Sequence, residues 1–438
     1  MILEFKVKNF LSFKDEQTLS FEASSDKTLR DYYCVDVTPK TSILKAGIIY
    51  GPNASGKTNV LKALDFIKKI ACEPKDKDEK TGFIPFLFDE KIKNEPGNFE
   101  VSFFIEGMKY IYKFEIDEDI IYNENLTYYP GTKPAIIYSR KYSKEDKKSK
   151  INYGSTLKLK ASDKAVLEGN TLNNMSLISA ISKSNIDFEE LVRVYYWFRN
   201  FFFPIILPST DLYYWTSNKI NSNQIPTHII LEILKSADLN ILGYSIKEHE
   251  KELDKDAIET INQIPETEEI KRKIIKDGKL IYTNIDFLHK ITGGNVIEQG
   301  KLPYEVESAG TKRFFELSGP LVHVFAYPKI LIIDEIENSL HYELVNHLIN
   351  IFLVNSKESQ LIFTTHNLNL LEDNDNIRKD VVWFTDKKED GSTELYSLND
   401  FDIRKNLSFI NAYKAGKFAA RPHLGSSFIE YNDKEKTK

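Results

Sequence analysis

Residues 51–58 of the chain, GPNASGKT, contain two glycines five positions apart, followed at once by a lysine and a threonine. An apolar run over residues 46–50 precedes this segment, and a helix-like pattern over residues 59–67 follows it. The sequence therefore predicts a strand, a tight turn and a helix, which is the context of a phosphate-binding loop. Glycines at 51 and 56 permit backbone conformations that a side chain would block. The loop amides can then point at phosphate oxygens at the positive end of the helix.

The side chains after the second glycine have the chemistry that a nucleoside triphosphate needs. Lys57 would supply a point charge to the β- and γ-phosphates, and the Thr58 hydroxyl would be a ligand for Mg²⁺. The residues of this loop that we predict to contact the nucleotide are Gly51, Asn53, Ser55, Gly56, Lys57, Thr58 and Asn59.

Two predicted strands in the C-terminal half carry the remaining polar groups of such a site. The apolar run over residues 330–333 ends in Asp334 and Glu335, and the run over residues 360–364 is followed by His366. Strand C-termini face the ligand crevice of an open α/β sheet. We therefore expect Asp334 to hold Mg²⁺, Glu335 to polarise the attacking water, and His366 to hydrogen-bond the γ-phosphate.

A third segment precedes a predicted helix over residues 311–327. Ser308 and Gly310 lie at its start, where backbone amides can bind an anion. Taken alone, Ser308 is more simply explained as an ordinary helix N-cap.

The predicted elements indicate an α/β protein. Residues 99–128 have the pattern of an antiparallel meander, whereas strands and helices alternate after residue 302, as in a parallel sheet. We expect an N-terminal lobe with the phosphate loop (1–140), an inserted, mainly helical region (141–300), and a C-terminal lobe (301–438).

Composition excludes several classes. The chain of 438 residues has a formal charge of −6, so it is not a basic nucleic-acid binder as a whole. Its two cysteines, Cys34 and Cys72, have no metal-ligand spacing and form no disulfide framework. The N-terminus lacks a signal-peptide pattern, and the apolar run over residues 201–207 is too short to span a bilayer. We expect a soluble, cytoplasmic protein.

Some segments allow two interpretations. The lysine-rich residues 141–150 and 271–276 are more typical of solvated surface than of nucleic-acid contacts. The aromatic run over residues 195–203 is more typical of a core than of a partner surface. Asp373 and Asp375 fit a polar loop better than an acidic metal pair.

These motifs together resemble those of the ABC-type ATPases related to RecF, Rad50 and the SMC proteins. The sequence is most similar to a bacterial group that includes the RloA- and AbiLi-type proteins and the AriA subunit of the PARIS anti-phage system. The similarity is carried by residues 5–14 (FKVKNFLSFK), 85–89 (PFLFD), 307–314 (ESAGTKRF), 334–341 (DEIENSLH) and 364–367 (TTHN).

The resemblance implies an ATPase that binds ATP and Mg²⁺ and forms a homodimer or higher homo-oligomer by head-to-tail contact of ATPase domains. Ser308 and Gly310, as the signature, would then act on the nucleotide of the other protomer. It further implies a sensor or regulatory subunit of an anti-phage defence system that controls a separate, co-encoded effector. A RecF-like repair ATPase that contacts DNA and an ATP-binding scaffold with little turnover are the alternatives.

Two departures from the family pattern affect the site. Ala309 stands where the family often has a polar or acidic residue, and no glutamine occurs between Asn59 and Leu159 to supply a Q-loop. Residues 85–89 are the candidate replacement. The 72 residues after His366 are too few for an additional Toprim nuclease, which needs on the order of a hundred, so we expect no nuclease activity.

Overall fold

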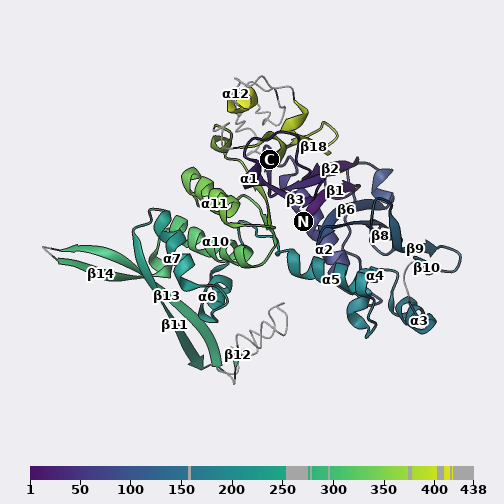
Figure 1. The fold of residues 1–438 in the computed structure, drawn as a ribbon, viewed down its shortest axis with the longest axis horizontal. Helices are drawn as coiled ribbons and strands as arrows, with labels where there is room; N and C mark the ends of the chain where they lie inside the picture. Colours follow the sequence, from purple (N-terminus) through teal and green to yellow (C-terminus); the bar gives the residue numbers. More distant parts are fainter. Residues whose placement is uncertain are drawn as a thin grey trace, which may run out of the picture.

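The computed structural model describes residues 1–155, 159–252, 275–276, 279–293, 296–372, 377–401, 409–414 and 417. Figure 1 shows an antiparallel sheet on one side of the molecule, a second antiparallel sheet on the opposite side, and helices between them. A mainly parallel sheet carries the phosphate loop. The expected α/β class, with antiparallel and parallel sheets combined, is confirmed.

The N-terminal sheet has seven antiparallel strands in the order β10-β9-β8-β7-β6-β1-β2. The predicted meander is present and is extended by two further strands. The bounds are β1 (Ile2–Lys8), β2 (Gln17–Ser20), β6 (Gly97–Ile105), β7 (Met108–Ile116), β8 (Ile121–Tyr129), β9 (Ala135–Ser143) and β10 (Lys148–Tyr153). Alternate residues of β1 are buried, as expected of a strand with one face on the core.

The mainly parallel sheet has the strand order β15-β16-β5-β17-β18. Its neighbouring strands are parallel except for the hairpin formed by the last two. Its strands are β5 (Ala46–Tyr50), β15 (Ile330–Ile333), β16 (Gln360–Thr365), β17 (Val382–Lys387) and β18 (Thr393–Ser397). Every residue of β5, β15 and β16 is buried. Continuous apolar runs form such strands because helices and loops cover both faces of a parallel sheet.

The run over residues 43–50 has the pattern of one continuous strand, but the structure has two strands there. These are β4 (Thr41–Leu44), which pairs with β3 (Cys34–Thr38), and β5. Lys45 separates them, and its buried ammonium donates to the Leu353 and Ser356 carbonyl oxygens at 2.5 and 2.9 Å. A charged side chain with these partners explains the break in an otherwise apolar run.

Helices surround the sheets, and two of them adjoin the strands that carry the predicted site. The first, α2 (Lys57–Cys72), begins at the phosphate loop, and α10 (Ala309–Ala326) begins directly after Ser308. The other helices are α1 (Arg30–Tyr33), α3 (Ala161–Asn170), α4 (Leu177–Ala180), α5 (Glu189–Phe201), α6 (Tyr213–Asn221), α7 (Thr227–Ser236), α11 (Tyr342–Asn355) and α12 (Phe409–Lys414).

The expectation of a mainly helical middle region is wrong in its second half. A four-stranded sheet lies there, formed by β11 (Ile241–Glu252), β12 (Ile275–Lys276), β13 (Lys279–Gly293) and β14 (Val296–Pro303). The predicted boundaries at residues 140 and 300 fall within β9 and β14, and the division into domains stays a prediction. The lysine-rich run that begins at residue 271 lies mostly outside the described residues.

The aromatic run over residues 195–203 belongs to the core for the most part. Trp197 and Phe198 are buried, and the Trp197 ring stacks on Phe103 of β6 at 4.1 Å between centroids. Tyr196 is the exception, with 52% of its surface exposed. The segment therefore joins α5 to the N-terminal sheet.

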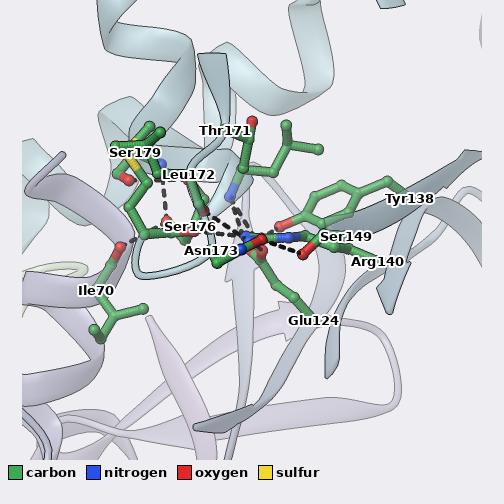
Figure 2. A network of polar contacts seen from close by, with 12 residues as sticks. Ile70, Glu124, Tyr138, Arg140, Ser149, Thr171, Leu172, Asn173, Ser176 and Ser179 are labelled. Carbon is green, nitrogen blue, oxygen red and sulfur yellow. Dashed lines mark hydrogen bonds and ion pairs between the residues drawn. The ribbon is translucent and has the colours of Figure 1, made fainter. Parts of the chain in front are cut away.

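A buried polar network connects that sheet to the far end of α2 (Figure 2). Glu124 and Arg140, on neighbouring strands, form a fully buried ion pair at 3.1 Å. Arg140 also donates to the Leu172 carbonyl oxygen at 2.7 Å. Ser176, in the same loop, donates to the Ile70 carbonyl oxygen of α2 at 2.6 Å. The helix that begins at the phosphate loop is thus fixed to the sheet at its other end.

Candidate functional site

The phosphate loop connects β5 to α2 and is shaped by its two glycines. Gly56 has φ 106°, a left-handed conformation that disfavours a side chain. A Cβ on Gly56 would also lie 2.2 Å from Thr393 Oγ1, and one on Gly51 would lie 2.3 Å from Thr385 Oγ1. Glycine is therefore required at both positions, for space at Gly51 and for space and conformation at Gly56.

Lys57 lies at the first position of α2 and its ammonium points back across the loop. It donates to the Gly51 and Pro52 carbonyl oxygens at 2.9 and 3.1 Å, and it lies 3.4 Å from Nδ1 of His366. Burial lowers the pKa of Lys57, and the carboxylates of Glu335 and other nearby acids oppose this shift. The ammonium is thus a partly desolvated cation that faces a cluster of acids.

Thr58 and Asp334 lie together although 276 positions separate them in the chain. The Thr58 hydroxyl donates to the Asp334 carboxylate at 2.9 and 3.1 Å. Thr364, at the end of β16, donates to the same carboxylate at 2.7 Å. Hydroxyl and carboxylate oxygens are ligands that Mg²⁺ prefers, so Thr58 and Asp334 have the donor set for this ion.

Glu335 and His366 face each other across the ends of β15 and β16. His366 Nε2 lies 3.3 Å from Glu335 Oε1. The His366 ring thus lies between the two charged groups, with Nδ1 facing the Lys57 ammonium and Nε2 facing the Glu335 carboxylate. The Glu335 backbone has φ 47°, a strained conformation for a non-glycine residue, and its N–H donates to Thr364 Oγ1 at 2.8 Å.

The other predicted loop residues have different environments. Ser55 is buried and its hydroxyl pairs with Thr385 Oγ1 at 2.6 Å, while Asn53 is exposed. Asn59 donates through its amide to Ser12 Oγ at 2.8 Å. Ser55 and Asn59 thus make contacts that shape the loop, and Asn53 lies at its surface.

Ser308 and Gly310 lie at the start of α10, and Gly310 is close to the segment that follows Asp334 and Glu335. Ser308 is exposed, and its hydroxyl accepts the Thr311 N–H at 3.1 Å, so it caps α10. A Cβ on Gly310 would lie 3.1 Å from the Ser339 carbonyl oxygen, and Ser339 has φ 64°. Gly310 thus lies close to the loop after β15, and Ser308 remains accessible from outside the chain.

The sequence analysis missed a strand-like segment that extends the five-stranded, mainly parallel sheet beyond β15, and the loop after it. Residues 202–206 run parallel to β15, with Asp334 N–H donating to the Ile206 carbonyl oxygen at 2.8 Å. Residues 207–211 therefore lie at the same sheet edge as the carboxylates. Arg313 of α10 donates to the Leu207 and Thr210 carbonyl oxygens, and Asn338 donates to that of Pro208. The available signal was the apolar run over residues 201–207, which is followed by Pro-Ser-Thr-Asp at residues 208–211.

The comparisons with known proteins bear on this arrangement. A family described as "AAA domain, putative AbiEii toxin, Type IV TA system" matches residues 48–372, which is 325 of 438 residues. The chain belongs to this family. The match spans the phosphate loop, Asp334 and His366, which are the residues that the structure brings together. The narrower resemblance to the AriA subunit is not established by this match.

Solved structures with similarity include two SMC head domains. One is "SMC head domain from Thermotoga maritima", 15% identical, with a TM-score of 0.40, covering 92% of this chain and 99% of that one. Another is a Smc head domain with an extended coiled coil bound to the C-terminal domain of ScpA, from Pyrococcus furiosus. It is 16% identical, with a TM-score of 0.36, covering 96% of this chain and 99% of that one. A comparison with curated protein sequences gives no match.

Two further expectations concern metals and membranes. Within the part of the chain that the structure describes, no group of three or more His, Cys, Asp or Glu side chains could hold a metal ion. Asp373 and Asp375 lie outside the described residues. Among the described helices, none has the length and apolar content to cross a membrane.

Proposed function

We propose that the protein is an Mg²⁺-dependent ATPase whose site is built around residues 51–58. The observation that carries the proposal is the convergence of five side chains from three strand ends. Lys57 contacts His366, His366 contacts Glu335, and Thr58 contacts Asp334, although the two halves are separated by more than 270 positions. A chance match to the phosphate-loop motif would not be expected to lie beside Asp334, Glu335 and His366.

Each side chain has a defined task in phosphoryl transfer. Lys57 neutralises charge on the β- and γ-phosphates, and Thr58 with Asp334 would hold Mg²⁺, which supplies further neutralising charge when bound. Glu335 orients a water and accepts its proton, and His366 donates a hydrogen bond toward the γ-phosphate. Thr364 holds the Asp334 carboxylate and the Glu335 backbone in place, since it donates to the first and accepts the N–H of the second.

We further propose that two copies meet head to tail, so that Ser308 and Gly310 of one protomer act on the nucleotide of the other. The exposure of Ser308 at the start of an 18-residue helix supports this arrangement. A helix N-terminus stabilises an anion, and the cap leaves the outer side of Ser308 open to a partner. ATP would then control dimerisation.

In the cell, we propose a sensor or regulatory ATPase of a bacterial anti-phage system that acts on a separate effector. The family description, with its toxin–antitoxin reference, supports this context. A repair ATPase that contacts DNA would instead need a basic groove, which the net charge of −6 disfavours. An ATP-binding scaffold would have the same site but little turnover.

The decisive experiment is ATP turnover by the wild type and by Glu335→Gln, each with and without Mg²⁺. We expect the variant to bind ATP and to hydrolyse it at least about a hundredfold more slowly, because the amide keeps the shape and loses the base. Its ATP-bound dimer should accumulate on size-exclusion chromatography. Undiminished turnover in Glu335→Gln would transfer the base role to another group, with His366 the first candidate.

The cellular role is tested separately by expressing the chain with and without its co-encoded neighbour. We expect growth arrest on phage challenge only when both are present, and no cleavage of DNA or RNA by the chain alone. A salt-dependent DNA gel shift by the purified chain would favour the repair alternative. Tight ATP binding without turnover by the wild type would favour the scaffold.

A further inference from the structure

An exposed apolar pair lies on the loop formed by residues 83–89. Leu87 is 62% exposed and Phe88 is 76% exposed, the largest exposed fraction of any large hydrophobic side chain in the described part of the chain. Ile84, on the same loop, is 48% exposed. Neighbouring exposed apolar side chains of this size indicate a contact surface rather than ordinary surface variation.

The loop is held in place by several hydrogen bonds. Asn9, 1% exposed, accepts the Phe86 N–H through its side-chain oxygen at 2.9 Å. Its amide donates to the Ile92 and Glu95 carbonyl oxygens at 2.8 and 2.6 Å. Phe88 also packs edge-on against the buried ring of Phe86 at 5.7 Å between centroids. The exposed ring is therefore pre-organised, which lowers the entropy cost of binding.

The hairpin formed by β17 and β18 connects Phe88 to the phosphate loop. A Cβ on Gly391, in the turn between β17 and β18, would lie 3.2 Å from the Phe88 ring. Two residues later, Thr393 donates to the Ser55 carbonyl oxygen at 2.8 Å. Two residues of extended chain span about 7 Å. The ring and the loop thus lie at neighbouring positions along the same hairpin.

An ion-paired lysine joins the two sides of this region. Lys14 contacts Asp89 at 2.9 Å and Asp390 at 3.1 Å, so it ties the 83–89 loop to the hairpin turn. Ser12, two residues earlier, accepts hydrogen bonds from Asn59 and Thr393. Residues of the first turn of α2, the hairpin and the 83–89 loop therefore form one continuous surface.

The order of the sheet sets the direction of a bound nucleotide. The carboxylates and His366 follow β15 and β16, on one side of β5, while β17 and β18 lie on its other side. In Figure 1, β18 lies beside β2 at the edge of the N-terminal sheet. A triphosphate whose terminal phosphate faces Glu335 would direct its nucleoside end toward the hairpin. Leu87 and Phe88 are exposed apolar side chains on that side, and the Phe88 ring lies beside the hairpin turn.

We propose that Phe88, supported by Leu87, is a stacking platform for the base of the bound nucleotide. This inference rests on the proposed nucleotide site and adds the residue that binds its nucleoside end. A purine offers the larger face to an aromatic ring, and stacking tolerates different ring edges. The platform therefore favours purine nucleotides over pyrimidine nucleotides and discriminates weakly between adenine and guanine.

The test compares the binding of ATP and of inorganic tripolyphosphate by calorimetry in the presence of Mg²⁺. Phe88→Ala should weaken ATP binding by about five- to a hundredfold, the range measured for loss of base–aromatic stacking. It should leave tripolyphosphate binding unchanged, because that probe has no base. Phe88→Tyr should retain ATP affinity. Tyr32→Ala is the matched control, since Tyr32 is 50% exposed and lies outside this region.

The other outcomes of this test distinguish a wrong stacking platform from a wrong nucleotide site. Equal ATP affinity in Phe88→Ala and the wild type overturns the platform, and loss of dimerisation in that variant would then assign the pair to a contact with a second copy of the chain. Equal loss of ATP and tripolyphosphate binding also overturns it, because the effect would then lie at the phosphates. A wild type that binds neither probe rejects the nucleotide site itself.

Discussion

At the scale of single residues, Thr364 fixes the relation between the two carboxylates that follow β15. Its hydroxyl donates to Asp334 and accepts the N–H of Glu335. The left-handed backbone at Glu335 costs on the order of 1–3 kcal/mol and persists only when its surroundings hold it. As a result, the two consecutive side chains point to different partners, Asp334 toward Thr58 and Glu335 toward His366.

Lys57 is the residue whose loss should be most damaging to binding. We expect Lys57→Ala to weaken ATP binding by about 2–4 kcal/mol, because the phosphates lose the fixed cation of the loop and its charge-assisted hydrogen bonds. Fluorescence or calorimetric titration of ATP measures this directly. Lys69→Ala is the control, since Lys69 lies on the same helix, has a side chain that is 54% exposed, and forms an ion pair with Asp65. Wild-type affinity in Lys57→Ala would show that the site lies elsewhere.

At the scale of elements, the site depends on strands that end at one sheet edge and on the helix that leaves it. The buried pair of Glu124 and Arg140 fixes the far end of α2 through residues 172–176 (Figure 2). Tyr112 and Tyr138 also donate to Glu124, and these two side chains are buried like the ion pair itself. Removing one charge would leave the other buried without an opposite charge beside it.

We therefore expect Arg140→Met to lower the free energy of unfolding by about 3–5 kcal/mol. Urea denaturation at neutral pH measures the change. Lys150→Met should change it by less than about 1 kcal/mol, because the Lys150–Asp146 pair is mostly exposed. The double variant Glu124→Leu, Arg140→Met should recover part of the loss, since it removes both charges. A loss in Arg140→Met no larger than that of the control would mean that the pair adds nothing to stability.

The elements differ in how far the sequence alone could predict them. The strands β5, β15 and β16 were predictable because they are continuous apolar runs followed by polar side chains. The strand β11 was not, because residues 247–252 are Lys, Glu and His, which resemble an exposed helix. Its stability comes from eleven paired positions on β13, a contact between distant segments that local composition does not reveal.

Local sequence pattern likewise predicts only part of the candidate site. Lys57, Asp334 and His366 were predictable from motifs that end or follow strands, and the structure brings them together. The segment 202–206 was missed because Pro204 and its aromatic neighbours resemble the end of a helix rather than a strand. It is held by backbone hydrogen bonds to β15, for which side-chain pattern gives no signal. The nucleotide contacts of Ser308 and Gly310 stay a prediction, since they require a second chain.

At the scale of the whole molecule, α10 presents its N-cap residue, Ser308, to solvent. Glu307, just before it, pairs with His289 of β13 at 2.5 Å, so the second antiparallel sheet is connected to the start of this helix. A partner that binds that sheet could therefore affect how α10 meets a second protomer. In the proposed head-to-tail dimer, two-fold symmetry would give two equivalent composite sites.

Mixing two inactive variants tests whether the sites are composite. Lys57→Ala lacks a working phosphate loop, and Ser308→Arg lacks a working signature. In a mixed dimer, the loop of the Ser308→Arg chain faces the signature of the Lys57→Ala chain, so one site regains both intact halves. Random exchange makes half of the dimers mixed, and we expect about a quarter of wild-type turnover per chain if the sites are independent. Differently tagged chains that co-purify would confirm the exchange, and thermal unfolding would check that Ser308→Arg, which loses an N-cap, remains folded. Confirmed exchange without recovered turnover would mean that the site is completed within one chain.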